Sequence, residues 1–414
     1  MKDMNYIKLL SAIIINSFGD ILFDLFIVWS ITVNSGDVMN AVYLIGGSIL
    51  FRALLSMFIG ILIDRYSKKL LMIISNISSV VVISALFLFL RFELSTLWIG
   101  IFFILINDIN NEIFRRGYVA ISAEIFEESL FIKFQSSYSV IVKVLSIGGS
   151  VIVGLMITYM SQSLIFSIDI LTFIIAIVLV YQIKSDKIYV IKEKEKLKIK
   201  EFSSIYNTLI SEVKVAFTAI FKVKFLKQFV ILMFVLNLAY GYIPYILPVI
   251  LSSKINSALF LGFIKAGIAV GEIIGLILVV KFGNNISLLF KFSMIGCIIS
   301  IVVVNFIDES IIIVLGFSMY GFSDSLTQPL FSHTVSSLDD KDRGKILGGI
   351  DTIILLSPSL GMFIGTFLQK INMTFSVIFL VGVFLFGYFI ISNSREFKNI
   401  NINKAIVRVD EKLI

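Results

Sequence analysis

Residues 60–69 read Gly60-Ile-Leu-Ile-Asp64-Arg65-Tyr-Ser67-Lys68-Lys69, a short basic turn between two long apolar stretches. A turn this short joins neighbouring antiparallel helices, and stretches this apolar belong in lipid. Lys and Arg gather in the cytoplasmic loops of membrane proteins. The stretch therefore predicts two membrane-spanning helices joined by a tight cytoplasmic loop.

Composition extends this interpretation to the whole chain. Of the 414 residues, 58% are hydrophobic and 15% are charged, whereas soluble domains are about 25% charged. A spanning helix needs about 20 apolar residues, and the segments are too long and too continuously apolar for barrel strands. We predict an all-α membrane protein with about twelve spans: 6–33, 38–63, 70–90, 95–118, 137–160, 163–183, 226–251, 257–281, 286–306, 309–332, 346–370 and 373–393.

The distribution of basic residues predicts the topology. The net charge is +7, and Lys and Arg collect in alternate loops. By the positive-inside rule, both termini are expected in the cytoplasm. Because the basic residues follow loop parity and do not form one face, nucleic acid is excluded as a partner. The expected location is the inner or plasma membrane, with the lipid bilayer as solvent.

The longest polar segment divides the chain in two. We expect an N-terminal six-helix bundle over 1–183, a cytoplasmic linker with an amphipathic helix over 184–225, a C-terminal six-helix bundle over 226–393, and a cytoplasmic tail over 394–414. Leu145–Gly154 and Leu356–Gly365 occupy corresponding positions and share a Leu-Ser start and a final Gly. Repeated halves suit alternating access, in which one half moves against the other around a midplane site.

Enzyme and cofactor signatures are missing from the sequence. It has no P-loop, no dinucleotide-binding glycine pattern after a strand and no His/Cys cluster at metal spacing. The single cysteine, Cys297, supports no disulfide framework. We therefore expect no enzyme activity, no cofactor and no metal site, and an ion gradient in place of ATP as the energy source.

The basic turn resembles the signature of the major facilitator superfamily, Gly-x-x-x-Asp-Arg-x-Gly-Arg-Arg/Lys. Gly60, Asp64, Arg65, Lys68 and Lys69 match it, and Ser67 replaces the second glycine. The resemblance implies that these five residues form a cytoplasmic gate. The chemistry fits, because a carboxylate suits a helix N-terminus and an Arg partner.

Within that superfamily the chain looks most like the macrolide-efflux type of drug:proton antiporter. Four stretches carry the resemblance: Phe18-Gly19-Asp20 with Trp29, the basic turn, Gly148-Gly149…Gly154, and Asp342-Arg343-Gly344. It implies efflux of antibiotic-like compounds in exchange for protons.

Ionisable residues inside spans are the candidates for proton coupling or for the substrate cavity, because charge in the bilayer is costly. Asp20 and Asp24 are one turn apart and share a helical face. Two carboxylates facing one cavity do not both ionise easily, which suits a proton carrier. The alternative is a fixed structural pair between Asp20 and a Lys or Arg.

Other spans carry further candidates. Glu112 lies in a polar stripe with Asp108, Arg115 and Arg116 at helical spacing, Lys265 and Glu272 lie two turns apart, and Asp324 lies in the tenth span. Two interpretations remain open for these residues: interhelical ion pairs, or a polar cavity for a substrate with charged groups.

Proline and glycine mark hinge or cavity positions. Pro244 and Pro248 follow Tyr240 in the seventh span, and prolines remove backbone hydrogen bonds and kink helices. Pro358 and the glycines Gly148, Gly149 and Gly154 are the further candidates.

The expected function is export of an amphipathic small molecule in exchange for protons, by a monomer. One alternative keeps the fold and changes the cargo to a small peptide, siderophore or metallophore. The other is a non-transporting membrane sensor, which a large soluble domain would support. The sequence does not distinguish proton coupling from sodium coupling.

Overall fold

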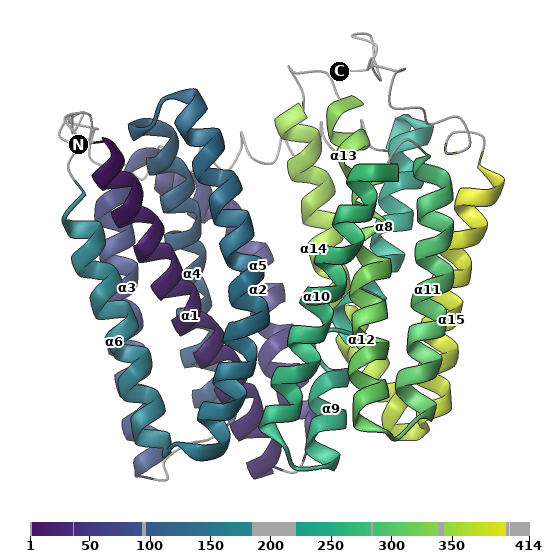
Figure 1. The fold of residues 1–414 in the computed structure, drawn as a ribbon, viewed down its shortest axis with the longest axis horizontal. Coiled ribbons are helices and arrows are strands. Elements are labelled where there is room, and N and C mark those ends of the chain that lie inside the picture. The colour runs from purple at the N-terminus through teal and green to yellow at the C-terminus, as the bar shows by residue number, and fades with distance from the viewer. Residues whose placement is uncertain are drawn as a thin grey trace, which may run out of the picture. The chain divides into compact units, whose positions relative to one another are not determined.

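The computed structural model describes residues 2–35, 37–92, 97–183, 221–282, 285–337, 343–394 and 397, and nearly all of these residues are helical (Figure 1). The predicted linker 184–225 lies outside the described residues as far as residue 220. Only residues 394 and 397 of the predicted tail are described.

Six long helices form the N-terminal half: α1 (Lys2–Ser35), α2 (Val38–Arg65), α3 (Lys68–Arg91), α4 (Leu97–Ile125), α5 (Glu128–Tyr159) and α6 (Gln162–Tyr181). Capping side chains start three of them. Asp37 accepts a hydrogen bond from the Met39 N–H at 2.8 Å, and Ser67 and Ser161 cap α3 and α6 in the same way. A side-chain oxygen at this position satisfies a backbone donor that the helix cannot.

The C-terminal half has more, shorter helices: α8 (Lys224–Tyr242), α9 (Leu247–Lys254), α10 (Ala258–Phe282), α11 (Ile286–Phe306), α12 (Ser310–Ser325), α13 (Gln328–Ser337), α14 (Arg343–Ile371) and α15 (Met373–Asn393). One predicted span is broken in the middle. Residues 243–246 form a turn between α8 and α9, with Pro244 inside the turn and Pro248 in the first turn of α9. Proline lacks the N–H that a continuous helix needs.

Ten helical segments among the described residues are long and apolar enough to cross a membrane, with α8 and α9 counted as one segment and the helical region Ser310–Phe331 as another. The two remaining crossings are α2, of which Val38–Arg52 is the apolar part, and α4. The length of α4 suffices, but its polar stripe of Asn, Asp, Glu and Arg lowers its hydropathy. The chain is thus an all-α membrane protein.

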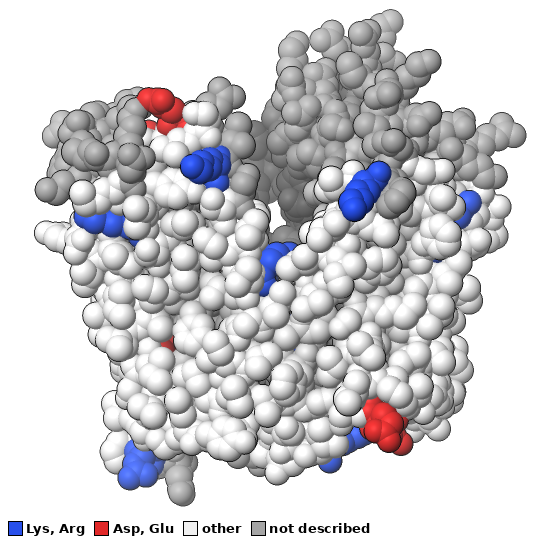
Figure 2. Space-filling model, in the orientation of Figure 1, with Lys and Arg blue, Asp and Glu red and all other residues white. Residues whose placement is uncertain are grey.

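The exposed and buried faces of α3 are those of a helix in lipid. Ile74, Ile77, Val81 and Leu88 are exposed and follow helical spacing along one side. The opposite side buries Ser75, Asn76 and Ser79 together with apolar residues. Apolar residues thus face outward, as lipid requires. In Figure 2 most charged side chains in view lie towards the upper and lower margins of the surface.

The chain divides into two compact units. One comprises residues 1–194 and 248–266, and the other comprises residues 195–247 and 267–414. In the first unit, α1 packs against α5 and α6, and α3 packs against α4 and α6. In the second, α8 packs against α14, and α11 packs against α12 and α15. The boundary at 266/267 falls inside α10, so α10 contributes to both units.

Candidate functional site

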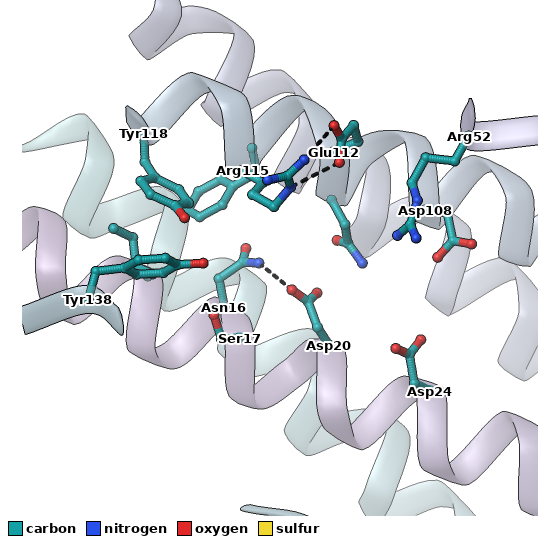
Figure 3. A pocket seen from close by; sticks show the side chains of 13 residues that line it. Asn16, Ser17, Asp20, Asp24, Arg52, Asp108, Glu112, Arg115, Tyr118 and Tyr138 are labelled. Carbon is teal, nitrogen blue, oxygen red and sulfur yellow. Dashed lines mark hydrogen bonds and ion pairs between the residues drawn. The ribbon is translucent and has the colours of Figure 1, made fainter. Parts of the chain in front are cut away.

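A cavity of about 190 Å³ lies inside the first unit, among α1, α2, α4 and α5 (Figure 3). Its wall is mostly polar, with a smaller aromatic part. The polar residues are Asn16, Ser17, Asp20, Asp24, Arg52, Asp108, Asn111, Glu112 and Arg115, and the aromatic ones are Phe114, Tyr118 and Tyr138. Four carboxyl groups therefore share one small cavity at membrane depth.

Helix α1 supplies one wall of the cavity. Asn16, Asp20 and Asp24 are successive turns on one face, as the spacing predicts. The Asn16 Nδ2 donates a hydrogen bond to Asp20 Oδ2 at 3.1 Å. The other oxygen of Asp20, Oδ1, is buried and has no hydrogen-bond partner. Asp24 is exposed, and its side chain opens into the cavity.

Helix α4 supplies the facing wall, where Glu112 is held by two arginines. Its carboxylate accepts hydrogen bonds from Arg115 Nε at 3.0 Å and Arg115 Nη2 at 2.7 Å. It also accepts one from Arg116 Nε at 2.5 Å. These are charge-assisted contacts, and the Arg115 pair is bidentate. Glu112 therefore has its charge matched within its own helix.

Arg52 of α2 is a cavity residue that sequence reasoning missed. Its guanidinium lies beside Asp108 in Figure 3, and its charge acts on both Asp108 and Asp24. The signal was present in the sequence, because Arg52 is a single basic residue inside an apolar span and such residues are functional candidates by default.

Aromatic rings close one end of the cavity. The rings of Tyr118 on α4 and Tyr138 on α5 lie 4.8 Å apart between centroids, and Phe114 lies one turn from Tyr118. Tyrosine faces attract cations. The cavity therefore combines carboxylates with aromatic faces.

The remaining predicted coupling residues lie elsewhere. Lys265 is in the part of α10 that belongs to the first unit, and its charge interacts with that of Asp24. Glu272 and Asp324 belong to the second unit. Asp324 acts there on Cys297 and Tyr320. Glu272 and Asp324 are therefore not part of the first unit's cavity.

The basic turn fastens three helices of the first unit. Ser67 caps α3 by accepting a hydrogen bond from the Leu70 N–H at 3.4 Å. Lys68 forms an ion pair with Glu124 of α4 at 2.6 Å. Lys69 donates to the Tyr181 and Ile183 carbonyls at the end of α6, at 2.7 and 2.8 Å. A cation at a helix C-terminus is favourable.

The other three members of the predicted gate are only partly described. Gly60, Asp64 and Arg65 lie in the last turns of α2, and their side chains are outside the described part of the chain. Their role in a gate stays a prediction.

The glycines of α5 have three different surroundings. Gly148 has open space around it, and Gly149 lies against Ile21 of α1. Gly154 lies against the α10 backbone, where an added Cβ would be 3.0 Å from the Ala258 carbonyl oxygen. Gly154 therefore permits a close approach of α5 and α10 within the first unit.

The other hinge candidates are Tyr240, Pro244 and Pro358 of the second unit, and Pro248, which begins the segment 248–266 of the first unit. Pro358 lies inside α14 against Gly241 of α8, where a Cβ would overlap the α14 backbone. Tyr240 is partly exposed and its ring lies 6.0 Å from that of Tyr245. Pro244 and Pro248 are buried at the break between α8 and α9.

Asp169 of α6 is a second ionisable residue that sequence reasoning missed. It is only 2% exposed, and its Oδ1 has no hydrogen-bond partner. It lies against α1, because a Cβ at Gly19 would be 3.1 Å from its Oδ1. The sequence signal is a single acid in an otherwise apolar span.

Comparisons with known proteins agree with this architecture. The family model described as Major Facilitator Superfamily matches residues 9–362. No curated protein sequence matches the chain.

Solved structures with the same fold include three transporters. The nucleoside transporter NupG has a TM-score of 0.69 at 12% identity, over 94% of this chain and 100% of that one. A POT family transporter in complex with a thioalcohol-conjugated peptide has a TM-score of 0.68 at 11% identity, over 94% of each chain. A bacterial homologue of the iron transporter ferroportin, in the inward-facing state, has a TM-score of 0.68 at 14% identity, over 94% and 98%. Identities this low show the fold alone.

Proposed function

The chain belongs to the Major Facilitator Superfamily, and from this premise we propose that it is a proton-driven exporter of an amphipathic small molecule. Membership makes it a membrane transporter. Export, proton coupling and the macrolide-efflux type are the parts that we propose, together with a plasma-membrane location and cytoplasmic termini.

The observation that carries the proposal is Asp20. Its side chain faces a polar cavity within a membrane-spanning helix, and one of its oxygens is buried without a partner. A carboxylate in such a position is costly unless a cation or a proton joins it. A group that can alternate between proton and substrate is what antiport requires.

The charges around Asp20 suggest a cationic substrate. Arg115 and Arg116 match Glu112, and Arg52 stands beside Asp108. Arg52 and Lys265 also act on Asp24, whereas the charges that act on Asp20 come from the carboxyl groups of Asp24 and Asp108. Tyr118 and Tyr138 add aromatic faces, which favour organic cations.

The cavity size fits a head group and not a whole drug. Pockets that enclose drug-sized ligands measure about 300–1,000 Å³, whereas this one measures about 190 Å³. We propose that the charged head of an amphipathic cation enters it while the apolar part stays outside.

A small peptide is the second candidate. The cavity wall carries guanidinium groups of Arg52 and Arg115 as well as carboxylates, and a zwitterion needs both signs. A substrate with a free carboxylate would compete for the arginines.

The experiment is export from an efflux-deficient bacterium that expresses the chain, followed by proton release in energised inside-out vesicles. Probes would be tetraphenylphosphonium, ethidium, macrolides and dipeptides, with an Asp20→Asn variant as control. We expect an organic cation to be exported and to release protons on addition. Transport of none of the probes, or transport indifferent to the pH gradient, would contradict the proposal.

A further inference from the structure

Asp169 is the most deeply buried carboxyl group in the described part of the first unit. It lies in α6, whose exposed side carries Leu164, Leu171 and Val178. Its own side chain faces the bundle and is 2% exposed. The Thr172 hydroxyl on the same helix donates a hydrogen bond to the main-chain oxygen of Asp169 at 2.7 Å. The buried carboxyl oxygen Oδ1 therefore has no donor.

Gly19 lets Asp169 approach α1 next to Asp20. A Cβ at Gly19 would overlap Thr172 Oγ1 and would be 3.1 Å from Asp169 Oδ1. Asp20 is the next residue, and its unpartnered Oδ1 is also buried. Asp20 thus has the cavity on one side and the packed α1–α6 contact on the other.

Buried polar side chains also join α3 to α4 in the same unit. The Asn110 amide donates to Ser78 Oγ at 3.0 Å, which fixes α4 against α3. Within one turn of this contact, Ser79 and Asn107 are both 0% exposed and hold side-chain polar atoms without partners. Lys69 of α3 contacts Ile183 at the end of α6. Ser79 lies about ten residues beyond Lys69 on α3, and Thr172 lies about as many residues before Ile183 on α6. Ser79 of α3 and Thr172 of α6 therefore lie at a similar depth in the bundle.

The charges around Asp169 are of its own sign. Asp20 and Asp24 are the groups whose charges act on it. The described basic residues of neighbouring helices lie further off: Lys8 and Lys69 bind the last carbonyls of α6, Arg91 lies at the far end of α3, and Lys143 lies on α5 six residues before Gly149. Like charges that act on one another oppose ionisation of all of them. Asp20 has one described donor, Asn16, whereas the Asp169 carboxyl oxygen Oδ1 has none, so Asp169 is the costlier of the two to ionise.

We propose that Asp169 is a second proton-binding residue and forms with Asp20 a carboxyl pair that holds the coupled proton out of water. Asp20 exchanges the proton with the cavity. The proton leaves the Asp20 carboxyl group and binds the Asp169 carboxylate, so the charge of the pair is unchanged by the transfer. The coupling part of this inference rests on the proposed proton-driven export.

Infrared spectroscopy of the purified chain in lipid nanodiscs tests the proton without any substrate. At neutral pH we expect a protonated-carboxyl band in the wild type that is lost in Asp169→Asn and retained in Asp308→Asn. Asp308 is an exposed acid between α11 and α12 and serves as the matched control. The band should be the same in sodium chloride and in choline chloride.

Several results would overturn the inference. Loss of an ionised band in Asp169→Asn would show that Asp169 carries charge. Loss of the protonated band in sodium would show a sodium site in place of a proton site. Failure of Asp169→Asn to fold would also count against it, because an amide closely mimics a neutral carboxyl group.

Transport assays distinguish the proposed role of the Asp20–Asp169 carboxyl pair from the proposed export function. In vesicles with an exported probe from the panel above, Asp169→Asn should keep exchange down a gradient and lose concentration against one. Retained uphill export would refute the coupling role, even with the band lost. If the wild type transports no probe or uses no proton gradient, the proposed function fails while the infrared result stands by itself.

Discussion

Asn16 donates a hydrogen bond to Asp20 from one turn earlier on α1, at 3.1 Å. The bond holds Oδ2 of Asp20 and leaves Oδ1 towards the packed interior. Asp20 is therefore oriented by its own helix and not by an ion pair, which distinguishes it from Glu112 on the facing wall.

Replacing Asp20 with Asn fixes the neutral state of the side chain. Because the variant cannot release a proton, we expect exchange of substrate down its gradient to continue and concentration against a gradient to stop. Proton release on substrate addition to energised vesicles should disappear. Uphill export that persists in the variant would remove Asp20 as the coupling site.

Replacing Glu112 with Gln leaves Arg115 and Arg116 without their carboxylate. Loss of a hydrogen bond to a charged group costs about 1.5–3 kcal/mol. We expect a loss of stability near the lower end of this range. The Arg115 and Arg116 side chains are 57% and 37% exposed, so water can replace part of the lost hydrogen bonding. The measure is thermal unfolding in detergent. A variant of unchanged stability that has lost proton coupling would show that Glu112 carries the proton.

Ser67 stands where the superfamily signature has glycine, and it caps α3. Replacing a capping Ser with Ala costs about 0.5–2 kcal/mol, and replacing it with Gly costs a few tenths. Since the Ser67 bond is long at 3.4 Å, we expect about 0.5–1 kcal/mol for Ser67→Ala and near-normal stability for Ser67→Gly. Equal stability of the two variants would mean that the cap contributes nothing.

His333 lies in α13, just beyond the apolar segment that ends at Phe331. Burial lowers the pKa of His333 below its ordinary value. The folded state thus binds the proton less readily than the unfolded state, so stability falls as pH drops below about 6.5. We expect His333→Gln to lose less stability than the wild type between neutral and acidic pH. Parallel unfolding curves for the two proteins would contradict this.

Topology is tested by cysteine labelling in a Cys297→Ser background. Tyr66 ends α2 and Ser163 begins α6, and both are exposed. With both termini in the cytoplasm, an impermeant reagent should label Ser163→Cys in intact cells and label Tyr66→Cys only after the membrane is opened. The reverse pattern would invert the predicted orientation.

The sequence predicts the membrane fold and one wall of the cavity well, for a physical reason. Apolar length fixes each span, and the i,i+4 spacing of Asp20 and Asp24 fixes their shared face. Spacing along one helix does not show which helix stands opposite. Glu272 and Asp324 therefore looked equivalent to Asp20, although they belong to the second unit. Arg52 and Asp169 were missed because each is a single charged residue in its span, with no second ionisable residue at helical spacing.

The division of α10 between the two units has a consequence for how the protein could be built. Residues 248–266 are encoded with the second half of the chain but pack as part of the first unit. If the polypeptide were made as two separate pieces, cut between 194 and 195, the second piece would still carry a segment of the first unit. The first unit would then be complete only when the second piece supplies residues 248–266 to it.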